Sequence, residues 1–329
     1  MNTSRSSSKT VQSCKVIVSS ILLLSSSITL AASCCGGGSA GSLIIPKFGK
    51  KIVDVTFDME HYQGKWNSNR KYIADPKADD LNQYRLNLGY GQRLSSNWQA
   101  AIVIPYVWND NQFSGESTKS DGLGDASASF WYEAFDRVTC VYQVNSLADL
   151  KPAMYFGGSL TIPTGKSAYG DHVSDDYEIT GRGLYRFDAN FVIEKTVYPL
   201  TVTLTGSYGK YFARPVNQEY GNPVEPYTKR LGDRKSLSAS LGYTVFLEDL
   251  DTVTFTTALS QLNEAEGKAA NTKNPAIEKQ SAAFTAAYAS PDLRYVYKAT
   301  WSHAFAANDR GMNFPVTDIF TLGLSYAFN

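Results

Sequence analysis

The sequence predicts an all-β protein, a transmembrane antiparallel up-and-down β-barrel of about twelve strands spanning residues 50–329. Three observations lead to this prediction. Apolar and polar residues alternate with a period of two in segment after segment, which is the pattern of strands with one apolar face. Short and long connections alternate along the chain in phase with these strands. Aromatic residues make up 13% of the chain, as expected for a barrel with two aromatic girdles.

The first three expected strands span residues 53–60, 84–92 and 98–108. In the first of them, Val53, Val55 and Phe57 alternate with polar residues. In the third, Trp98 and Trp108 lie on one face. A strand rises about 3.4 Å per residue and tilts by about 45°, so the two rings are separated by about the height of a membrane barrel's apolar band. Both rings are therefore expected at the edges of that band.

The other nine expected strands are at residues 126–134, 153–162, 183–193, 200–208, 237–245, 253–259, 282–288, 294–305 and 320–329. Each has apolar or aromatic residues on one face. In strands 200–208, 237–245 and 253–259 the opposite residues are nearly all Ser or Thr. In the last strand, Phe320, Leu322 and Leu324 share one face. With this strand the count reaches twelve, an even number.

The connections differ in length in a regular way. Short connections are expected at residues 95–97, 196–199, 248–251 and 290–292, and long polar ones at 67–82, 109–122, 164–180, 210–235, 263–279 and, somewhat shorter, 306–315. Outer-membrane barrels have short periplasmic turns and long extracellular loops. The link at 135–151 is an exception, because it is long and falls on the side of the short turns. The alternative, a soluble secreted sandwich, would need an unusually aromatic core to cover the same faces.

Residues 1–33 are expected to form a secretory signal peptide. Arg5, Lys9 and Lys15 precede an apolar stretch at 16–30, and small residues follow at 31–33. Serines interrupt the apolar stretch, so a transmembrane helix is the weaker interpretation. Residues 34–49 are expected to be a flexible, Gly-rich leader. Cys34 is either a lipid-attachment site or a residue beside an ordinary peptidase cleavage site.

Composition and motifs argue against several functions. The chain has 31 basic and 31 acidic residues, a balance that argues against nucleic acid as a partner. Ser302 and His303 are adjacent, so they point to opposite faces and cannot form a nucleophile and base pair. A loop with one histidine and several carboxylates is expected to be solvated rather than to bind a metal; its residues are Asp171, His172, Asp175, Asp176 and Glu178. No catalytic, metal or cofactor site is predicted.

The face opposite the aromatic residues contains Ser, Thr, Gly, Asn and charges of both signs. Eight charged residues are expected to face the lumen, namely Asp54, Asp58, Arg85, Glu133, Arg186, Asp188, Arg294 and Lys298. About twelve strands enclose a narrower space than the roughly 16 to 18 strands that leave a wide water channel. The charges are therefore expected to pair across the lumen and to narrow it.

The C-terminal strand resembles the signal at the end of bacterial outer-membrane barrels. Thr321, Gly323, Tyr326 and Phe328 supply a polar residue, a glycine and two aromatic residues at the spacing of that signal, with Asn329 as one extra residue. The resemblance implies that this strand closes on the first strand and is recognised by the barrel-assembly machinery.

Two other segments resemble a single family. Residues 121–125 (Asp-Gly-Leu-Gly-Asp) and 158–165 (Gly-Ser-Leu-Thr-Ile-Pro-Thr-Gly) are similar to motifs of the outer-membrane proteins grouped as "meta-pathway of phenol degradation" transporters. The family implies a barrel that passes small, often hydrophobic or aromatic molecules. In physical terms, the glycines allow a turn into a strand, Asp125 can hydrogen-bond nearby backbone and Pro163 ends a strand. A ligand contact by Asp121 or Asp125 is the less favoured alternative.

The expected function is a porin-like channel or transporter in the outer membrane of a Gram-negative bacterium, for passive passage of small solutes. Its expected partners are outer-membrane lipids and lipopolysaccharide, the barrel-assembly machinery and a small-molecule solute. One alternative is a non-conducting structural or adhesive barrel that acts through its extracellular loops. Another is an outer-membrane hydrolase that depends on His172 or His303.

Overall fold

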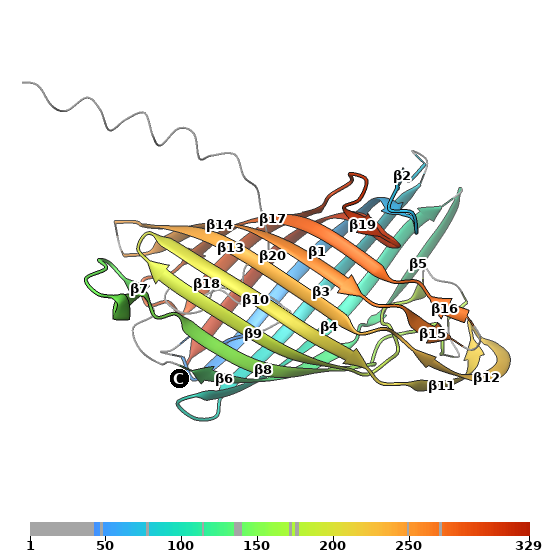
Figure 1. Cartoon of the computed structure of the whole chain (residues 1–329), viewed down its shortest axis with the longest axis horizontal. Coiled ribbons are helices and arrows are strands. Elements are labelled where there is room, and N and C mark those ends of the chain that lie inside the picture. Colours follow the sequence, from blue (N-terminus) through green and yellow to red (C-terminus); the bar gives the residue numbers. More distant parts are fainter. Residues whose placement is uncertain are drawn as a thin grey trace, which may run out of the picture.

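The computed structural model describes residues 43–46, 49–76, 79–113, 115–134, 140–170, 173–174, 178–248, 250–269 and 272–329. Twelve antiparallel strands close into a barrel (Figure 1), as the sequence predicts. They are β1 (Lys51–Trp66), β3 (Asp80–Arg93), β4 (Trp98–Phe113), β6 (Ala126–Ala134), β8 (Ala153–Ile162), β9 (Arg186–Val197), β10 (Leu200–Tyr211), β13 (Arg234–Phe246), β14 (Thr252–Glu264), β17 (Ile277–Ala289), β18 (Tyr295–Ala304) and β20 (Phe314–Phe328). Each strand pairs with the barrel strand before it and the one after it in this order.

The barrel closes between its first and last strands. β1 and β20 pair from Lys51 opposite Phe328 to Trp66 opposite Phe314, with a register shift between Tyr62 and Gly64. The C-terminal strand therefore finds its partner at the other end of the sequence. This pairing removes the two free edges that an open sheet of the same strands would have.

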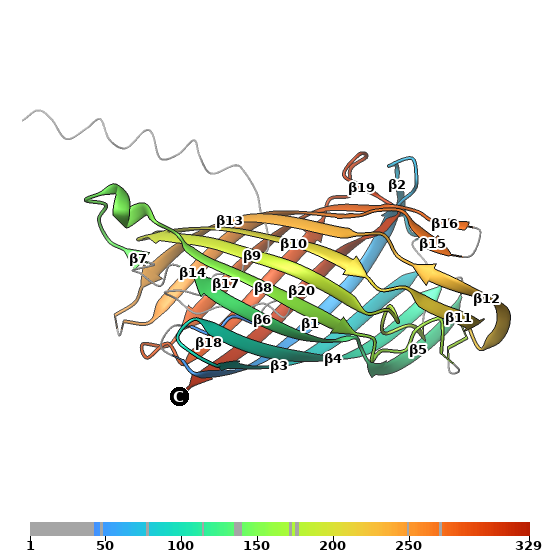
Figure 2. The ribbon, with the colours of Figure 1, turned by 60° about the horizontal axis from the view of Figure 1, so that its bottom comes forward.

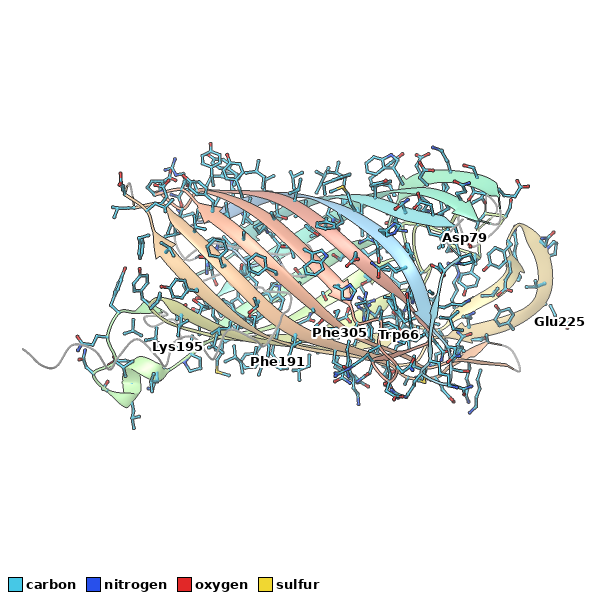
Figure 3. The ribbon with its side chains drawn as sticks, turned by 90° about the horizontal axis from the view of Figure 1, so that it is seen from above. Trp66, Asp79, Phe191, Lys195, Glu225 and Phe305 are labelled. Carbon is cyan, nitrogen blue, oxygen red and sulfur yellow. The ribbon has the colours of Figure 1, made fainter. Side chains whose placement is uncertain are left out.

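Side chains alternate between the outer surface and the lumen. Val53 is 40% exposed on the outer face, whereas its neighbour Asp54 is 2% exposed and points inward. Large apolar residues are exposed around the whole barrel, including Leu88, Ile102, Phe130, Phe156, Val202, Leu241, Phe255, Phe284, Trp301 and Leu322. Figure 3 shows side chains as sticks that project outward from the ribbon around the barrel. The apolar outer face expected from the period-two pattern is thus present on the folded barrel.

The two ends of the barrel carry different connections. The end with the short turns from β3 to β4, β9 to β10, β13 to β14 and β17 to β18 is called the turn end below, and the opposite end the loop end (Figures 1 and 2). The long connection from β6 to β8 is at the turn end, where it holds β7 (Cys140–Val141) and the 3-10 helix η2 (Leu147–Leu150). No helix in the described part of the chain is long and apolar enough to cross a membrane.

Several of the long connections contain strands of their own. β4 runs past its expected end and forms a hairpin with β5 (Glu116–Leu123). A separate sheet at the loop end consists of β11 (Arg214–Glu219), β12 (Asn222–Arg230), β15 (Gly267–Ala269) and β16 (Thr272–Asn274). β2 (Tyr72–Ala74) pairs with β1, and β19 (Gly311–Met312) pairs with β17. The sequence pattern missed these extensions because strand pairing continues through polar residues beyond the apolar band.

Candidate functional site

The barrel lumen is the candidate site, because polar side chains gather on its wall. Between β9 and β18 this wall consists mainly of Ser and Thr. Hydroxyl groups on neighbouring strands hydrogen-bond one another in the pairs Thr196–Thr201 (2.9 Å), Ser207–Ser236 (2.7 Å), Thr244–Thr254 (3.0 Å), Ser260–Ser281 (2.8 Å) and Thr285–Thr300 (2.8 Å). These side chains are short and uncharged, so they form a polar wall that projects little into the lumen.

Charged residues lie on the part of the wall formed by β18, β20, β1 and β3. The ammonium nitrogen of Lys298 is 3.4 Å from Asp54 Oδ1, and the Ser325 hydroxyl also donates a hydrogen bond to this carboxylate. β20 lies between the strands of the ion pair, and Gly323 leaves room on β20 for the lysine chain. Asp54 is buried, and an uncompensated buried carboxylate would be costly. Lys298 and Ser325 therefore compensate its charge.

Arg85 on β3 lies between two carboxylates of β1. Its Nη2 is 3.3 Å from Glu60 Oε2 and its Nη1 is 3.6 Å from Asp58 Oδ2. Asp58 also accepts hydrogen bonds from Asn87 at 2.9 Å and from the Thr321 hydroxyl at 2.6 Å. Two carboxylates share one guanidinium, so this cluster has a net negative charge.

Residues 43–46, named the lumen segment here, lie inside the barrel near the turn end. Leu43, Ile44 and Ile45 are 1%, 2% and 1% exposed. Their packing partners come from five strands and are Ile52, Ala101, Trp131, Ala153, Tyr155 and Val192. These strands follow one another around the barrel, so the segment packs along one part of the wall and fills part of the lumen with apolar side chains.

Polar contacts hold the lumen segment in place. The Ile45 N–H donates to Gln99 Oε1 at 2.6 Å, and Arg93 Nη2 donates to the carbonyls of Ile45 and Pro46 at 3.1 and 3.4 Å. Arg93 Nη1 is 3.1 Å from Glu133 Oε2, so the predicted lumen carboxylate Glu133 orients the arginine that holds the segment. Each of these side chains lies at the turn end of its strand.

Two glycines on β3 make room for the lumen segment. A Cβ atom on Gly91 would lie 3.0 Å from Ile52 and 3.4 Å from atoms of both Leu43 and Ile45, and one on Gly89 would lie 3.3 Å from Leu43. These contacts are close, so larger side chains at these positions would press on the segment. The pattern of small residues on this face of β3 thus matches the chain that passes over it.

A flexible leader was expected at residues 34–49, but its residues 43–46 are held in the lumen. The sequence contained one signal for the lumen segment, the apolar run Leu43-Ile44-Ile45 in a stretch of Gly and Ser. This run has no period-two pattern, and its burial depends on strands that come much later in the chain. Cys34 and the expected signal peptide lie outside the described residues.

Arg186 and Asp188 form an ion pair at the loop end of the lumen. Both are on β9, and the guanidinium Nε is 2.9 and 2.8 Å from the two carboxylate oxygens. Close by, Arg182 donates to Glu264 Oε2 at 2.6 Å and to the Tyr211 hydroxyl at 2.5 Å. The sequence analysis missed Arg182 because it lies in a loop, and Glu264 because its strand was expected to end at residue 259.

One predicted lumen charge is not in the lumen. Arg294 lies in the turn before β18, and its guanidinium is 3.5 Å from Asp292 in the same turn. The expected strand began one residue too early, so its alternation was applied to an exposed turn. The other seven lie on inward faces. Each of their ion pairs joins two residues of the same strand, of adjacent strands, or of strands separated by one other strand. The expectation that the charges pair across the lumen is therefore wrong.

The two motif segments meet at the loop end of β6 and β8. Asp125 accepts hydrogen bonds from the N–H groups of Gly165 at 3.1 Å and Arg182 at 2.7 Å. The Thr164 hydroxyl donates to the Gly124 carbonyl at 2.6 Å. Burial raises the pKa of Asp125, although these N–H donors act in the opposite direction. Asp125 thus has a structural role, but it bonds backbone groups 40 and 57 residues away rather than the local backbone expected from the sequence.

The remaining candidate residues are spread over the barrel. On β20, Thr321 and Gly323 face the lumen, whereas Tyr326 and Phe328 face outward with ring centres 5.5 Å apart. His303 Nδ1 is 2.8 Å from Asp318 Oδ1, and Ser302 is buried on the opposite face of its strand. In the loop cluster at 171–178, Glu178 is described by the structure. The other members of the cluster lie outside the described residues, namely Asp171, His172, Asp175 and Asp176. In the part that is described, no three metal-binding side chains come together.

The chain matches no family model and no curated protein sequence. Its fold is similar to that of solved structures. The COG4313 outer membrane channel from Pseudomonas putida F1 is 12% identical, with a TM-score of 0.63 over 85% of this chain and 96% of that chain. The β domain of the Bordetella autotransporter BrkA is 15% identical, with a TM-score of 0.51 over 85% of this chain and 100% of that chain. The barrel fold is thus shared with a channel and with an autotransporter domain.

Proposed function

We propose that the protein is an outer-membrane channel for small solutes and that the lumen segment closes it at the turn end. The observation that carries this proposal is an apolar outer face around a polar lumen. Lipid accepts the outer face directly, and a wall of hydroxyl groups and ion pairs can hold water. The fold that the chain shares with the Pseudomonas putida channel supports the proposal.

In this proposal the barrel is exported by the signal peptide at 1–33 and is inserted by the barrel-assembly machinery. Thr321, Gly323, Tyr326 and Phe328 form the recognition signal for that machinery. Lipopolysaccharide and phospholipid surround the apolar outer face. The resemblance of segments 121–125 and 158–165 to the phenol-degradation transporter family implies hydrophobic or aromatic solutes, and no enzymatic activity is part of the proposal. Cys34, if acylated, adds a lipid tether at the N-terminus.

The lumen segment favours a second candidate, a barrel that does not conduct. Its three aliphatic residues are almost fully buried, and a permanently filled lumen would leave only the loop end to act. Such a protein would be structural or adhesive. The two candidates differ in one physical respect, which is whether the segment can leave its position while the barrel stays folded.

Conductance of the refolded mature protein in a planar bilayer separates the two candidates. The wild type is compared with a variant that lacks residues 43–46, and a variant that lacks residues 36–39 serves as the control deletion of equal length. We expect discrete current steps that are frequent without residues 43–46 and rare in the other two proteins. If the variant without residues 43–46 is folded, as judged by a heat-dependent gel shift, and does not conduct, the channel proposal fails.

A further inference from the structure

Three arginines come together at the loop end of the lumen. Arg182 precedes β9, Arg186 is the first residue of β9 and Arg234 is the first residue of β13. β10 lies between β9 and β13, and its last residue Tyr211 is opposite Arg186. On the other side of β13, Glu264 is opposite Arg234. Strand pairing therefore brings these residues to one level of the barrel.

Two of the three arginines are paired with acids and the third is not. Arg186 binds Asp188, and Arg182 binds Glu264 at 2.6 Å. Their guanidinium carbons also lie 5.4 and 5.6 Å from the centre of the Tyr211 ring. Among the residues that the structure describes, no side chain forms an ion pair or hydrogen bond with the Arg234 guanidinium. Its neighbour in register, Glu264, is already bound to Arg182.

The surroundings of Arg234 favour an anion. The side chain is partly exposed on the lumen wall, where the positive charges of Arg186 and Arg182 repel it and Glu264 attracts it. Lys279 on β17 interacts more strongly with Glu60 than with Arg234, but it also repels Arg234, and its ammonium nitrogen lies 4.9 Å from the centre of the Phe314 ring. A cation beside other cations is unfavourably placed, and a guanidinium has paired N–H donors that match the two oxygens of a carboxylate. A carboxylate would thus supply the partner that Arg234 lacks.

A cavity at the loop end borders this cluster at Arg182 and Glu264. It has a volume of about 320 Å³ and is lined by residues that include Arg182, Glu264, Tyr169, Tyr220 and Lys229. The Lys229 ammonium lies 5.6 Å from the centre of the Tyr169 ring. Aromatic faces and positive charges thus occur together in a space large enough for a small organic acid. The small sheet of β11, β12, β15 and β16 lies at the same end of the barrel (Figure 1).

We propose that Arg234, together with Arg182 and Arg186, binds the carboxylate of a small organic acid that enters the lumen from the loop end. This inference rests on the proposed channel function and adds the solute class to it. Neutral molecules of the same shape bind more weakly, because they leave the Arg234 guanidinium without a charged partner. The site then selects organic acids before they reach the lumen segment.

Fluorine NMR of the full-length mature protein in detergent tests the site without any need for conductance. The probe is 4-fluorobenzoate, and 4-fluorobenzamide is its neutral counterpart. We expect saturable binding of the benzoate, and Arg234→Gln should weaken it by at least about tenfold, the effect of losing one charge-assisted hydrogen bond. Lys235→Gln is the matched control, because Lys235 is the next residue of β13 and is exposed on the other face. This control should bind like the wild type.

Three results would overturn the inference. They are no saturable binding to the folded wild type, equal affinity for benzoate and benzamide, and equal benzoate affinity of Arg234→Gln and Lys235→Gln. A second measurement does not depend on the variants: benzoate, but not benzamide, should raise the urea midpoint of the wild type. Conductance distinguishes a failure of the carboxylate site from a failure of the channel proposal. Benzoate binding to the wild type, with no conductance in the folded variant that lacks residues 43–46, supports the site and refutes the channel proposal. Conductance of that variant without benzoate binding to the wild type supports the channel and refutes the site.

Discussion

In the proposed channel, replacing Ile44 by alanine should make the open state more frequent. Ile44 is 2% exposed and packs against Trp131 and Val192. Truncation of a buried isoleucine costs about 2 to 5 kcal/mol. The lumen segment can shift to fill part of the cavity, so we take the lower part of this range, about 2 to 3 kcal/mol. Each 1.4 kcal/mol is a factor of about ten, so the ratio of closed to open channels should fall by about 30- to 140-fold.

Single-channel recording in planar bilayers measures this ratio as the fraction of time spent in each state. The matched control is Ile73→Ala, which removes the same atoms from a residue that is 47% exposed on β2. This variant should keep the wild-type ratio, because β2 lies at the loop end, away from the lumen segment. Both variants must first show the heat-dependent gel shift of a folded barrel.

The reasoning would be refuted by a folded Ile44→Ala protein whose closed-to-open ratio equals that of Ile73→Ala. Packing of Ile44 would then contribute nothing to closure. Frequent opening of the wild type, Ile44→Ala and Ile73→Ala alike would also refute closure by the lumen segment. The segment would then be present without blocking the current.

Three other predictions concern the rest of the lumen and its loop end. Gly91→Leu should increase the open fraction in the same recordings, because a Cβ at this position already lies 3.4 Å from Leu43 and Ile45. Asp125→Asn should reduce the pH dependence of the urea midpoint. Burial raises the pKa of Asp125 above 3.8, so its protonated form stabilises the fold below pH 3.8, and this contribution is lost as pH rises through the raised pKa. Arg85→Gln leaves Asp58 and Glu60 without their guanidinium, so reversal potentials should shift toward cations. The loss of a charge about 4 Å away is worth about 1 kcal/mol under water-like screening, or about fivefold in the permeability ratio.

The strands could be predicted because their signal is local. Successive side chains of a strand point to opposite faces, so Val53 could be assigned outward and Asp54 inward without knowledge of any other strand. Strand ends were less certain. β4 was expected to end at residue 108 and ends at Phe113, because pairing with β5 continues after the apolar residues stop. The same uncertainty at the start of β18 placed Arg294 wrongly in the lumen.

The partners of the lumen residues could not be predicted. Lys298 meets Asp54 because β18, β20 and β1 become neighbours when the barrel closes. Asp125 binds Gly165 and Arg182 because the ends of β6, β8 and β9 meet at the loop end. In each case the contact joins residues that are distant in the sequence.

The sequence by itself determined the period-two strands, their number, the apolar outer face and the difference between short and long connections. Only the tertiary structure decided which charges pair, that Arg234 has no acidic partner among the described residues, and that residues 43–46 occupy the lumen. The physical reason is that alternation along a strand sets the direction of a side chain, whereas its contacts depend on the register and closure of strands far away in the chain.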